Sequence, residues 1–410
     1  MIPLSEAQNF VLAAVKPKEP EKVSLDEAFG MTASENLLSN ESIPAYDNSA
    51  MDGYAISETD RVRLNGVKAV TLKVHTTIAA GPNADQTISD GEAARIMTGA
   101  PIPNGTSCVV IVEDTTFEND SVTIKQSYQP GDNIRRAGSD IASGEKVLAR
   151  GTTLQAAHLG VLASVGHSSI TAFGRPQIGV ISTGNELVEE NRSLRRGEIR
   201  DSNRHSIMAI VRTTGAEVVD LGIVRDDPQV LRDAFASAAR DLDAIITSGG
   251  VSVGDFDYTK SILKELSGNT ARWMQIAIRP AKPFAFGLIG STPFFALPGN
   301  PVSALVSFEL LVRPAIRKML GQSQLFSANL SAIAVNDYQR SMDGKTHFVR
   351  SQLFADQDGT LFVEALDKQS SHMLHEMSRA NSLVIVPDGN GFSKSDQVKV
   401  MPLGTANLFF

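Results

Sequence analysis

Between residues 176 and 321, short apolar runs alternate with segments whose apolar residues recur at helical spacing. The apolar runs are residues 178–182, 218–224, 244–246, 274–278 and 294–297. Two of the helical segments begin with Asp227-Pro228 and Asn300-Pro301, a cap residue followed by a first-turn proline. This alternation predicts a doubly wound parallel α/β sheet. Ligands of such sheets bind beyond the carboxyl ends of the strands, so the loops there are the candidate site.

The loop after residues 244–246 is rich in glycine, hydroxyl and carboxylate groups. It contains Ser248, Gly249, Gly250, Ser252, Gly254, Asp255 and Asp257. Glycines let backbone N–H groups approach an anion, because a Cβ would clash there. Carboxylates beside such a cradle suit a hard cation that also binds phosphate oxygens. The alternative is a tight strand-to-helix turn capped by an aspartate, and the loop alone does not separate the two.

Three further loops at the same expected sheet edge carry charge. Glu186 follows one strand, the Asp226-Asp227 pair follows the next, and Arg279 lies close to Lys282. Carboxylates beside fixed cations suit a magnesium-assisted reaction at phosphate. Asp227 precedes a proline and is interpreted mainly as a helix cap. Arg279 and Lys282 flank prolines, so a stiff backbone favours a specific anion site.

The remainder of the chain predicts three more structural units. Helices are expected at residues 3–15, capped by Ser5, and at 23–30, both in a packing or dimerisation element. Residues 43–138 contain runs rich in β-branched residues separated by turn residues, which predict strands. Residues 142–170 return to the pattern of the N-terminal segment. Five short apolar runs after residue 325 predict a small β-barrel.

The expected domains follow from these changes of pattern. A linker or dimerisation domain comprises residues 1–42 and 139–172, and an inserted β-rich domain comprises 43–138. The α/β domain comprises 173–321 and the barrel 325–410.

Composition excludes several classes of function. The net charge of −8 argues against nucleic acid or an anionic membrane as the main partner. Cys108 is the only cysteine, which excludes a disulfide framework or a thiolate metal centre within one chain. Residues 1–17 have no secretory pattern and no apolar run reaches membrane-spanning length, so a cytoplasmic location is expected. Walker, dinucleotide and nucleophile-elbow motifs are absent. Residue patterns thus predict a nucleotide- or phosphate-handling α/β enzyme with a clasping second subunit or domain.

Five motifs identify a known family. They are Asp-Asn-Ser-Ala-Met-Asp-Gly-Tyr-Ala (47–55), Ile-Met-Thr-Gly-Ala-Pro (96–101), Ser-Thr-Gly-Asn-Glu-Leu (182–187), Ser-Gly-Gly-Val-Ser-Val-Gly (248–254) and Leu-Pro-Gly-Asn-Pro-Val-Ser (297–303). Together they closely resemble the MoeA family, the molybdopterin molybdenumtransferases, which are related to the gephyrin E domain. The resemblance spans nearly the whole chain. It implies an elongated four-domain homodimer that uses Mg²⁺ and reacts adenylylated molybdopterin with molybdate, giving molybdenum cofactor and AMP. It also implies the molybdopterin adenylyltransferase and cofactor-accepting apoenzymes as protein partners.

The resemblance assigns roles to particular residues. Those around the reacting phosphate are Asp52, Thr98, Glu186 and Asp257, and the candidate magnesium ligands are Asp226 and Asp257. The pterin nucleotide is expected at Ser248, Gly249, Gly250, Ser252 and Asp226, and molybdate at Arg279, Lys282, Ser303, Arg350 and Ser371. The chain departs from the commoner family residues, which are lysine at Gln275 and Arg279 and glycine at Ala281. The guanidinium of Arg is planar with several fixed N–H donors, whereas the ammonium of Lys is a compact charge. The geometry of anion binding at position 279 therefore differs from that of the commoner lysine.

Two other functions stay open at this stage. A non-catalytic dimeric scaffold of the gephyrin E-domain type would use the same surfaces for binding alone. A molybdopterin adenylyltransferase, or a related nucleotide hydrolase, would use the same α/β unit. Retention of Asp257 and the cationic residues favours the enzyme over the scaffold. The adenylyltransferase would leave the inserted domain and the barrel without a role.

Overall fold

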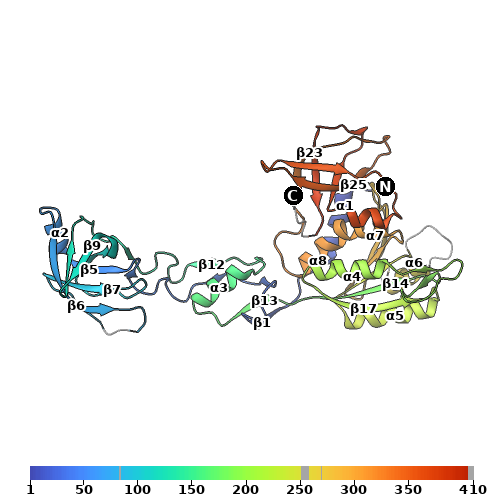
Figure 1. The fold of residues 1–410 in the computed structure, drawn as a ribbon. Helices are drawn as coiled ribbons and strands as arrows, with labels where there is room; N and C mark the ends of the chain where they lie inside the picture. The colour runs from blue at the N-terminus through green and yellow to red at the C-terminus, as the bar shows by residue number, and fades with distance from the viewer. Residues whose placement is uncertain (83–84, 251–257, 269, 405–410) are drawn as a thin grey trace.

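The computed structural model describes residues 1–82, 85–250, 258–268 and 270–404. The molecule is elongated (Figure 1), with a β-rich lobe at one end and the α/β sheet and barrel at the other. A narrow middle region with α3 and β12 joins the two ends. Within the described residues, no helix is long and apolar enough to span a membrane.

The α/β region contains a six-stranded sheet in the order β17-β14-β18-β22-β21-β19. Its strands are β14 (Gln177–Thr183), β17 (Glu217–Val224), β18 (Ala244–Ser248), β19 (Arg272–Gln275), β21 (Pro283–Ile289) and β22 (Thr292–Leu297). The first four in spatial order are parallel, β21 is antiparallel to β22, and β19 is antiparallel to β21. The predicted doubly wound sheet is confirmed, but β21 was missed. It forms a hairpin with β22 around Gly290, whose φ of 62° suits a tight turn.

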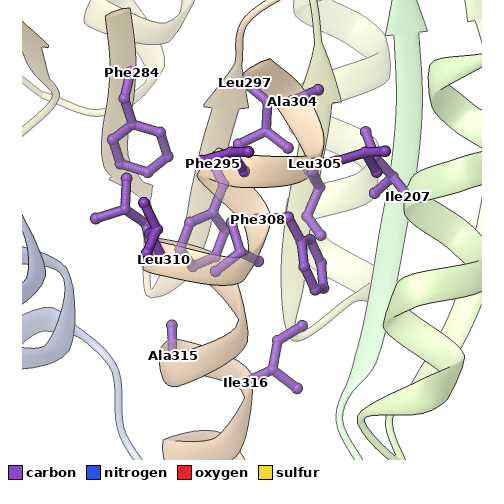
Figure 2. Packing of buried hydrophobic residues seen from close by; sticks show 14 of the residues in the cluster. Ile207, Phe284, Phe295, Leu297, Ala304, Leu305, Phe308, Leu310, Ala315 and Ile316 are labelled. Atoms are coloured by element: carbon purple, nitrogen blue, oxygen red, sulfur yellow. The ribbon is translucent and has the colours of Figure 1, made fainter. Parts of the chain in front are cut away.

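Helices cover both faces of this sheet. They are α4 (Asn203–Thr213), α5 (Pro228–Asp241), α6 (Tyr258–Leu266), α7 (Pro301–Ser307) and α8 (Arg313–Met319). Side chains alternate along a strand, so Ile246 packs in the core under α4 and α7 while Ile245 packs under α5 and α6. Figure 2 shows Leu305 and Phe308 between Phe295 of the sheet and Ile207 of α4.

Pro314 lies in the last helical segment of the α/β region, where a proline commonly kinks a helix. The structure instead has a π-helical turn at Phe308–Val312, directly before α8. Pro314 has no N–H, so it cannot donate to the carbonyl of Leu310. Gln8 Nε2 donates to that carbonyl at 3.0 Å. The irregular turn therefore accommodates the proline and leaves no unpaired carbonyl at Leu310.

Helix α1 (Leu4–Ala14) forms as predicted, although its surroundings differ from those expected. Ala7 and Val11 are fully buried in the core shared with α8, and Ile2 N donates to Gln275 O at 2.8 Å. The first helix thus packs on the α/β region and not on the rest of residues 1–42. Ser5 does not cap it, because the residue at the cap is Pro3, with no side-chain hydrogen bond.

The predicted helix at residues 23–30 is wrong. This segment belongs to β1 (Pro20–Ser24), which pairs with β13 (Ser169–Phe173), and the chain then turns at 25–27. A short segment cannot sustain a helix alone, and strand pairing satisfies its backbone groups. The middle region also contains β2 (Thr32–Ala33), β3 (Leu37–Leu38), β12 (Lys146–Leu148) and α3 (Ala156–Ser164). Residues 142–173 therefore pack with residues 20–38, as the shared pattern predicted.

The predicted β-rich lobe is a six-stranded sheet in the order β8-β5-β7-β6-β10-β9. Its elements are β5 (Gly53–Ser57), α2 (Glu58–Leu64), β6 (Val70–Ile78), β7 (Glu92–Ile96), β8 (Thr106–Ile111), the 3-10 turn Val112–Asp114, β9 (Thr115–Glu118) and β10 (Ser121–Ile124). The short pair β4 (Asn48–Ser49) and β11 (Ile134–Arg135) lies where the chain enters and leaves it.

The predicted C-terminal barrel is confirmed. Its strands are β23 (Leu330–Ala334), β25 (Thr346–Ala355), β26 (Leu361–Ala365), β27 (Ser382–Val386) and β29 (Gln397–Pro402), and pairing of β25 with β27 closes it. Small elements beside the sheets are β15 (Leu187–Val188), β16 (Ile199–Arg200), β24 (Tyr338–Gln339), β28 (Gly391–Phe392) and α9 (Leu374–Arg379). Strand β20 (Ile278–Arg279) leaves the α/β region to pair with β25. The barrel is thereby joined to the loop that carries Arg279.

Candidate functional site

Two acidic loops meet at the carboxyl edge of the α/β sheet. Asn185 N donates to Asp226 Oδ2 at 3.2 Å, and Asp226 N donates to Asn185 Oδ1 at 3.2 Å. This reciprocal pair holds the loops after β14 and β17 together. Burial and the neighbouring charge of Glu186 raise the pKa of Asp226. Glu186 and Asp226 thus lie close enough for their carboxylates to interact, as expected for residues of one site.

The start of the glycine-rich loop is tightly constrained. Gly249 N donates to Leu297 O at 3.1 Å, and Gly250 has a φ of 73°. A Cβ at Gly250 would lie 2.4 Å from the side chain of Thr259. These positions therefore need glycine for steric reasons. Ser252, Asp255 and Asp257 were predicted in this loop and lie outside the described residues.

Ser248 is buried at the end of β18 and its environment is structural. Its Oγ accepts a hydrogen bond from Asn203 Nδ2 at 2.7 Å, and the same Nδ2 donates to Gly299 O at 2.8 Å. Asn203 begins α4, so these contacts tie that helix to the ends of two strands. The loops that carry the candidate residues share one rigid support.

A cavity of about 530 Å³ lies between the α/β region and the barrel. Its polar and charged lining residues are Arg279, Lys282, Asn300, Ser303, Lys345, Gln369, Ser370, Ser371 and His372. No carboxylate is among the described lining residues. Within the described structure, the side chains of Arg279 and Lys282 make no hydrogen bond or ion pair. Two cations with no carboxylate partner among the described residues suit the binding of an anion, in a protein whose net charge is −8.

The loop that carries both cations is held by its backbone. Ile276 N donates to Lys282 O at 2.8 Å, and Arg279 lies on β20 beside the barrel. Ala281 between them has a φ of 77° and is buried. A residue with a Cβ in this conformation costs roughly 1–2 kcal/mol. The alanine that replaces the commoner glycine is therefore strained, and the surrounding contacts hold it in place.

Arg350 has a different position from the one expected. It is 1% exposed and does not line the cavity. Its Nη1 donates to Ser370 O at 3.1 Å and its Nη2 to Lys368 O at 2.5 Å. Gln369 also binds the backbone of Arg350 through both ends of its side-chain amide. Arg350 therefore positions the loop that presents Ser370 and Ser371, while its buried Nε has no hydrogen-bond partner among the described residues.

Asp52 and Thr98 form a compact pair in the β-rich lobe. Thr98 donates from its N at 2.7 Å and from its Oγ1 at 2.9 Å to Asp52 Oδ1. These two bonds lower the pKa of the Asp52 carboxyl, and both residues are hydrogen-bonded while exposed. The neighbouring strands β5 and β7 lie at the opposite end of the molecule from β14 and β17 (Figure 1). A single chain therefore brings Asp52 close to Thr98 and Glu186 close to Asp226, and it keeps these two pairs apart.

Sequence reasoning missed several residues of the cavity. Lys345, Gln369, Ser370 and His372 come from the barrel, whose strand pattern carries no signal of a ligand. Asn300 was interpreted as a helix cap, yet its Nδ2 donates to Ser371 Oγ at 3.1 Å and makes no cap bond. Asp227 does cap its helix, accepting from Gln229 N and Val230 N. The neighbouring Asp226 is the pair member that faces the site.

A second acidic group lies outside the predicted site. Glu189, Glu190 and His205 could place one ligand atom each within 4.8 Å of one another. The guanidinium of Arg204 already binds Glu189 at 2.6 Å, together with Asp201 and Asp220. The guanidinium of Arg204 therefore already supplies the positive charge at these carboxylates, and the group is a structural ion-pair network.

The fold and the two sites together define a protein class, a molybdopterin-binding type α/β domain extended by an inserted lobe and a barrel. Three family models match along the chain: MoeA N-terminal region (domain I and II) at residues 2–166, probable molybdopterin binding domain at 179–318, and MoeA C-terminal region (domain IV) at 335–403.

Relatives and solved structures agree with these matches. The chain is 36% identical to molybdopterin molybdenumtransferase of Haemophilus influenzae, covering 98% of both chains. It is 34% identical to the protein of that name from Nostoc, covering 94% of this chain and 89% of the relative. A crystal structure of the molybdopterin biosynthesis MoeA protein from Pyrococcus horikoshii superimposes with a TM-score of 0.85 at 26% identity, covering 98% of this chain and 100% of that one. The chain belongs to the MoeA family of molybdopterin molybdenumtransferases.

Proposed function

We propose that this protein is a molybdopterin molybdenumtransferase that reacts adenylylated molybdopterin with molybdate and releases AMP. The observation that carries the proposal is the cavity with the unpaired cations Arg279 and Lys282, set beside the glycine-rich loop of a family α/β domain. Molybdate is an oxyanion, and charged N–H donors bind oxyanions more strongly than neutral donors do. The hydroxyls of Ser303 and Ser371 line the same cavity and supply further donors.

The carboxylates at the neighbouring edge fit a divalent cation. Burial and the neighbouring charge of Glu186 raise the pKa of Asp226, and a cation beside the two carboxylates would stabilise their ionised forms. We propose that Asp226, with Asp257 of the undescribed part of the loop, holds Mg²⁺. When bound, the metal would neutralise charge on the phosphoanhydride. Glu186 orients this edge through the loop that also carries Asn185, and backbone N–H groups of the glycine-rich loop donate to the phosphates.

The separation of the two sets of residues supports a homodimer. Asp52 and Thr98 adjoin β5 and β7, and these strands lie at the end of the molecule remote from the α/β sheet (Figure 1). We propose that the β-rich lobe of one protomer closes over the α/β edge of its partner. Closure would exclude water from a hydrolysis-prone anhydride. The proposal includes a cytoplasmic location, with the adenylyltransferase as donor of the nucleotide and cofactor-accepting apoenzymes as recipients of the product.

AMP release from adenylylated molybdopterin, with and without molybdate, tests the proposed reaction. We expect release to depend on molybdate, and Lys282→Ala to raise the molybdate concentration for half-maximal rate by about tenfold, because one charge-assisted contact is lost. The exposed barrel residue Lys394 is the matched control, and Lys394→Ala should leave the rate unchanged. Release independent of molybdate would indicate a nucleotide hydrolase. Binding without turnover would indicate a scaffold.

A further inference from the structure

The barrel contributes a third cation to the wall of the anion cavity. Lys345 lines the cavity together with Arg279 and Lys282. We propose that Lys345 binds the oxyanion from the barrel side, so that the substrate is held across the junction of the two domains. This inference rests on the proposed function and adds a binding residue to it.

The ammonium of Lys345 is oriented and still has donors to offer. Its Nζ donates to Asp343 Oδ2 at 2.8 Å, and the side chain is 21% exposed. An ammonium has three N–H donors, and among the described residues only Asp343 accepts from it. Asp343 does not line the cavity. Two N–H donors of the ammonium therefore have no acceptor among the described residues, and the carboxylate that binds the third lies outside the cavity lining.

Asp343 also binds other basic side chains, so its negative charge is not available to Lys345 alone. Arg340 Nη2 binds Asp343 at 2.6 Å and Asp388 at 2.7 Å, and His347 Nε2 lies 3.3 Å from Asp343. The hydrogen bond from Lys345 is the largest cause that lowers the pKa of Asp343, to about 2. Burial lowers the pKa of His347, which favours its neutral form at neutral pH. This network fixes the ammonium with little freedom, and a preorganised cation loses less entropy on binding an anion.

Strand pairing sets the position of Lys345 relative to Arg279. Ile278 and Arg279 of β20 pair in parallel with Thr346 and His347 of β25, and Thr346 N donates to Ala277 O at 2.9 Å. Lys345 immediately precedes this pairing. The two cations thus come from adjacent hydrogen-bonded strands, one from each domain. An anion between them would bind both domains, which a cavity built from the α/β loop alone could not achieve.

Direct titration of the purified full-length protein with molybdate, without pterin, tests the role of Lys345. The variants are Lys345→Ala, Lys345→Gln and Lys345→Arg, with Lys282→Ala as the positive control and Lys394→Ala as the matched surface control. We expect loss of the charge to raise the molybdate Kd by about tenfold or more, and Lys345→Arg to retain most of the affinity. The Gln variant keeps length and a donor, so it reports on charge if the Ala variant does not fold.

The outcomes separate the two proposals. An unchanged Kd in the Ala and Gln variants, with a raised Kd in Lys282→Ala, overturns the role of Lys345 and leaves the proposed function intact. Failure of the wild-type protein to bind molybdate, or an unchanged Kd in Lys282→Ala as well, overturns the anion cavity and with it both proposals. A rise in Kd in the Lys394→Ala control equal to that in Lys345→Ala would overturn the inference as a nonspecific charge effect.

Discussion

Thr98 donates two hydrogen bonds to a single carboxylate oxygen of Asp52, one from its backbone N and one from its Oγ1. Two donors on one oxygen fix the carboxylate and stabilise its ionised form. The other oxygen, Oδ2, accepts no hydrogen bond among the described residues and faces a surface position. The carboxylate thus joins two loops of the lobe while one of its oxygens stays open, which favours a function at a surface that a partner covers.

Thr98→Val tests this arrangement. Valine keeps the shape and the backbone donor but removes the hydroxyl, so the pKa of Asp52 should rise and kcat should fall about tenfold, the effect of losing one charge-assisted hydrogen bond. Thr123→Val is the control, because the Thr123 hydroxyl bonds only Thr71 on the exposed face of the same sheet. AMP release measures both. Equal activity of Thr98→Val and wild type would remove the pair from catalysis.

Asp227→Ala separates the two acidic residues of the second loop. Asp227 Oδ1 accepts from Gln229 N at 2.9 Å and Val230 N at 3.0 Å. Loss of such a cap costs about 1 kcal/mol of unfolding free energy. We expect denaturant unfolding to detect that loss while turnover stays near wild type. Asp226→Ala should show the reverse, with reduced turnover at little cost in stability. Inactive Asp227→Ala of unchanged stability would reassign the cap as a ligand.

The sequence predicted elements wherever local patterns and tertiary contacts agree. The strand begun by residues 244–246 and the helix begun by Asp227-Pro228 are examples, because an apolar run specifies the first and cap chemistry the second. The helix expected at 23–30 failed because pairing of Val23 with Ile170 decides its conformation. Such a partner is 147 residues away and leaves no local pattern.

The candidate site shows the same limit. The glycines and the helix-capping carboxylates on the α/β loops were identifiable from their spacing in the sequence. Lys345 was not, because its position depends on the pairing of β20 with a barrel strand. Arg350 was assigned to the right region, but only the structure shows that it binds the carbonyls of Lys368 and Ser370. Burial of an arginine has no sequence signature.

Gly250→Ala tests the steric requirement at the glycine-rich loop. A Cβ there would lie 2.4 Å from Thr259, and the φ of 73° disfavours any side chain. Gly290→Ala is the matched control, since its φ is 62° with no atom within 4 Å of the added carbon. Both variants bear the backbone cost of roughly 1–2 kcal/mol. We expect Gly250→Ala to unfold at a lower denaturant concentration than Gly290→Ala. Similar midpoints would mean that the side chain of Thr259 moves aside at no measurable cost in unfolding free energy.

The pH dependence of stability tests the network around Asp343. Its folded pKa of about 2 lies below the unfolded value of 3.8, so the stabilisation is present above pH 3.8 and lost as pH falls toward 2. Asp343→Asn should therefore lower the unfolding free energy at pH 7 by on the order of 1 kcal/mol, allowing for solvent screening. The difference from wild type should shrink between about pH 4 and pH 2. Asp358→Asn, at an exposed position, is the control. A difference that persists unchanged at pH 2 would contradict the assignment.

The separation of Asp52 from the α/β edge leads to a prediction about mixed dimers. If the lobe of one protomer completes the site of the other, Asp52→Ala and Asp226→Ala each inactivate both sites of a homodimer. In a heterodimer of the two variants, one site combines both substitutions and the other has neither. Equal mixing makes half of the dimers heterodimeric, so about a quarter of wild-type activity should return by two-fold symmetry.

The measurement is AMP release after subunit exchange, with exchange followed independently by differently tagged protomers. The control is a mixture of Asp226→Ala with Lys282→Ala, two substitutions on the same α/β region. In that heterodimer each site carries one substitution, so its activity should not exceed the average of the separate homodimers. Restored activity only in the Asp52 mixture would indicate that the two regions meet across the interface, because the β-rich lobe and the α/β sheet lie at opposite ends of a single chain (Figure 1). Exchange without any recovery would instead place Asp52 outside the shared site.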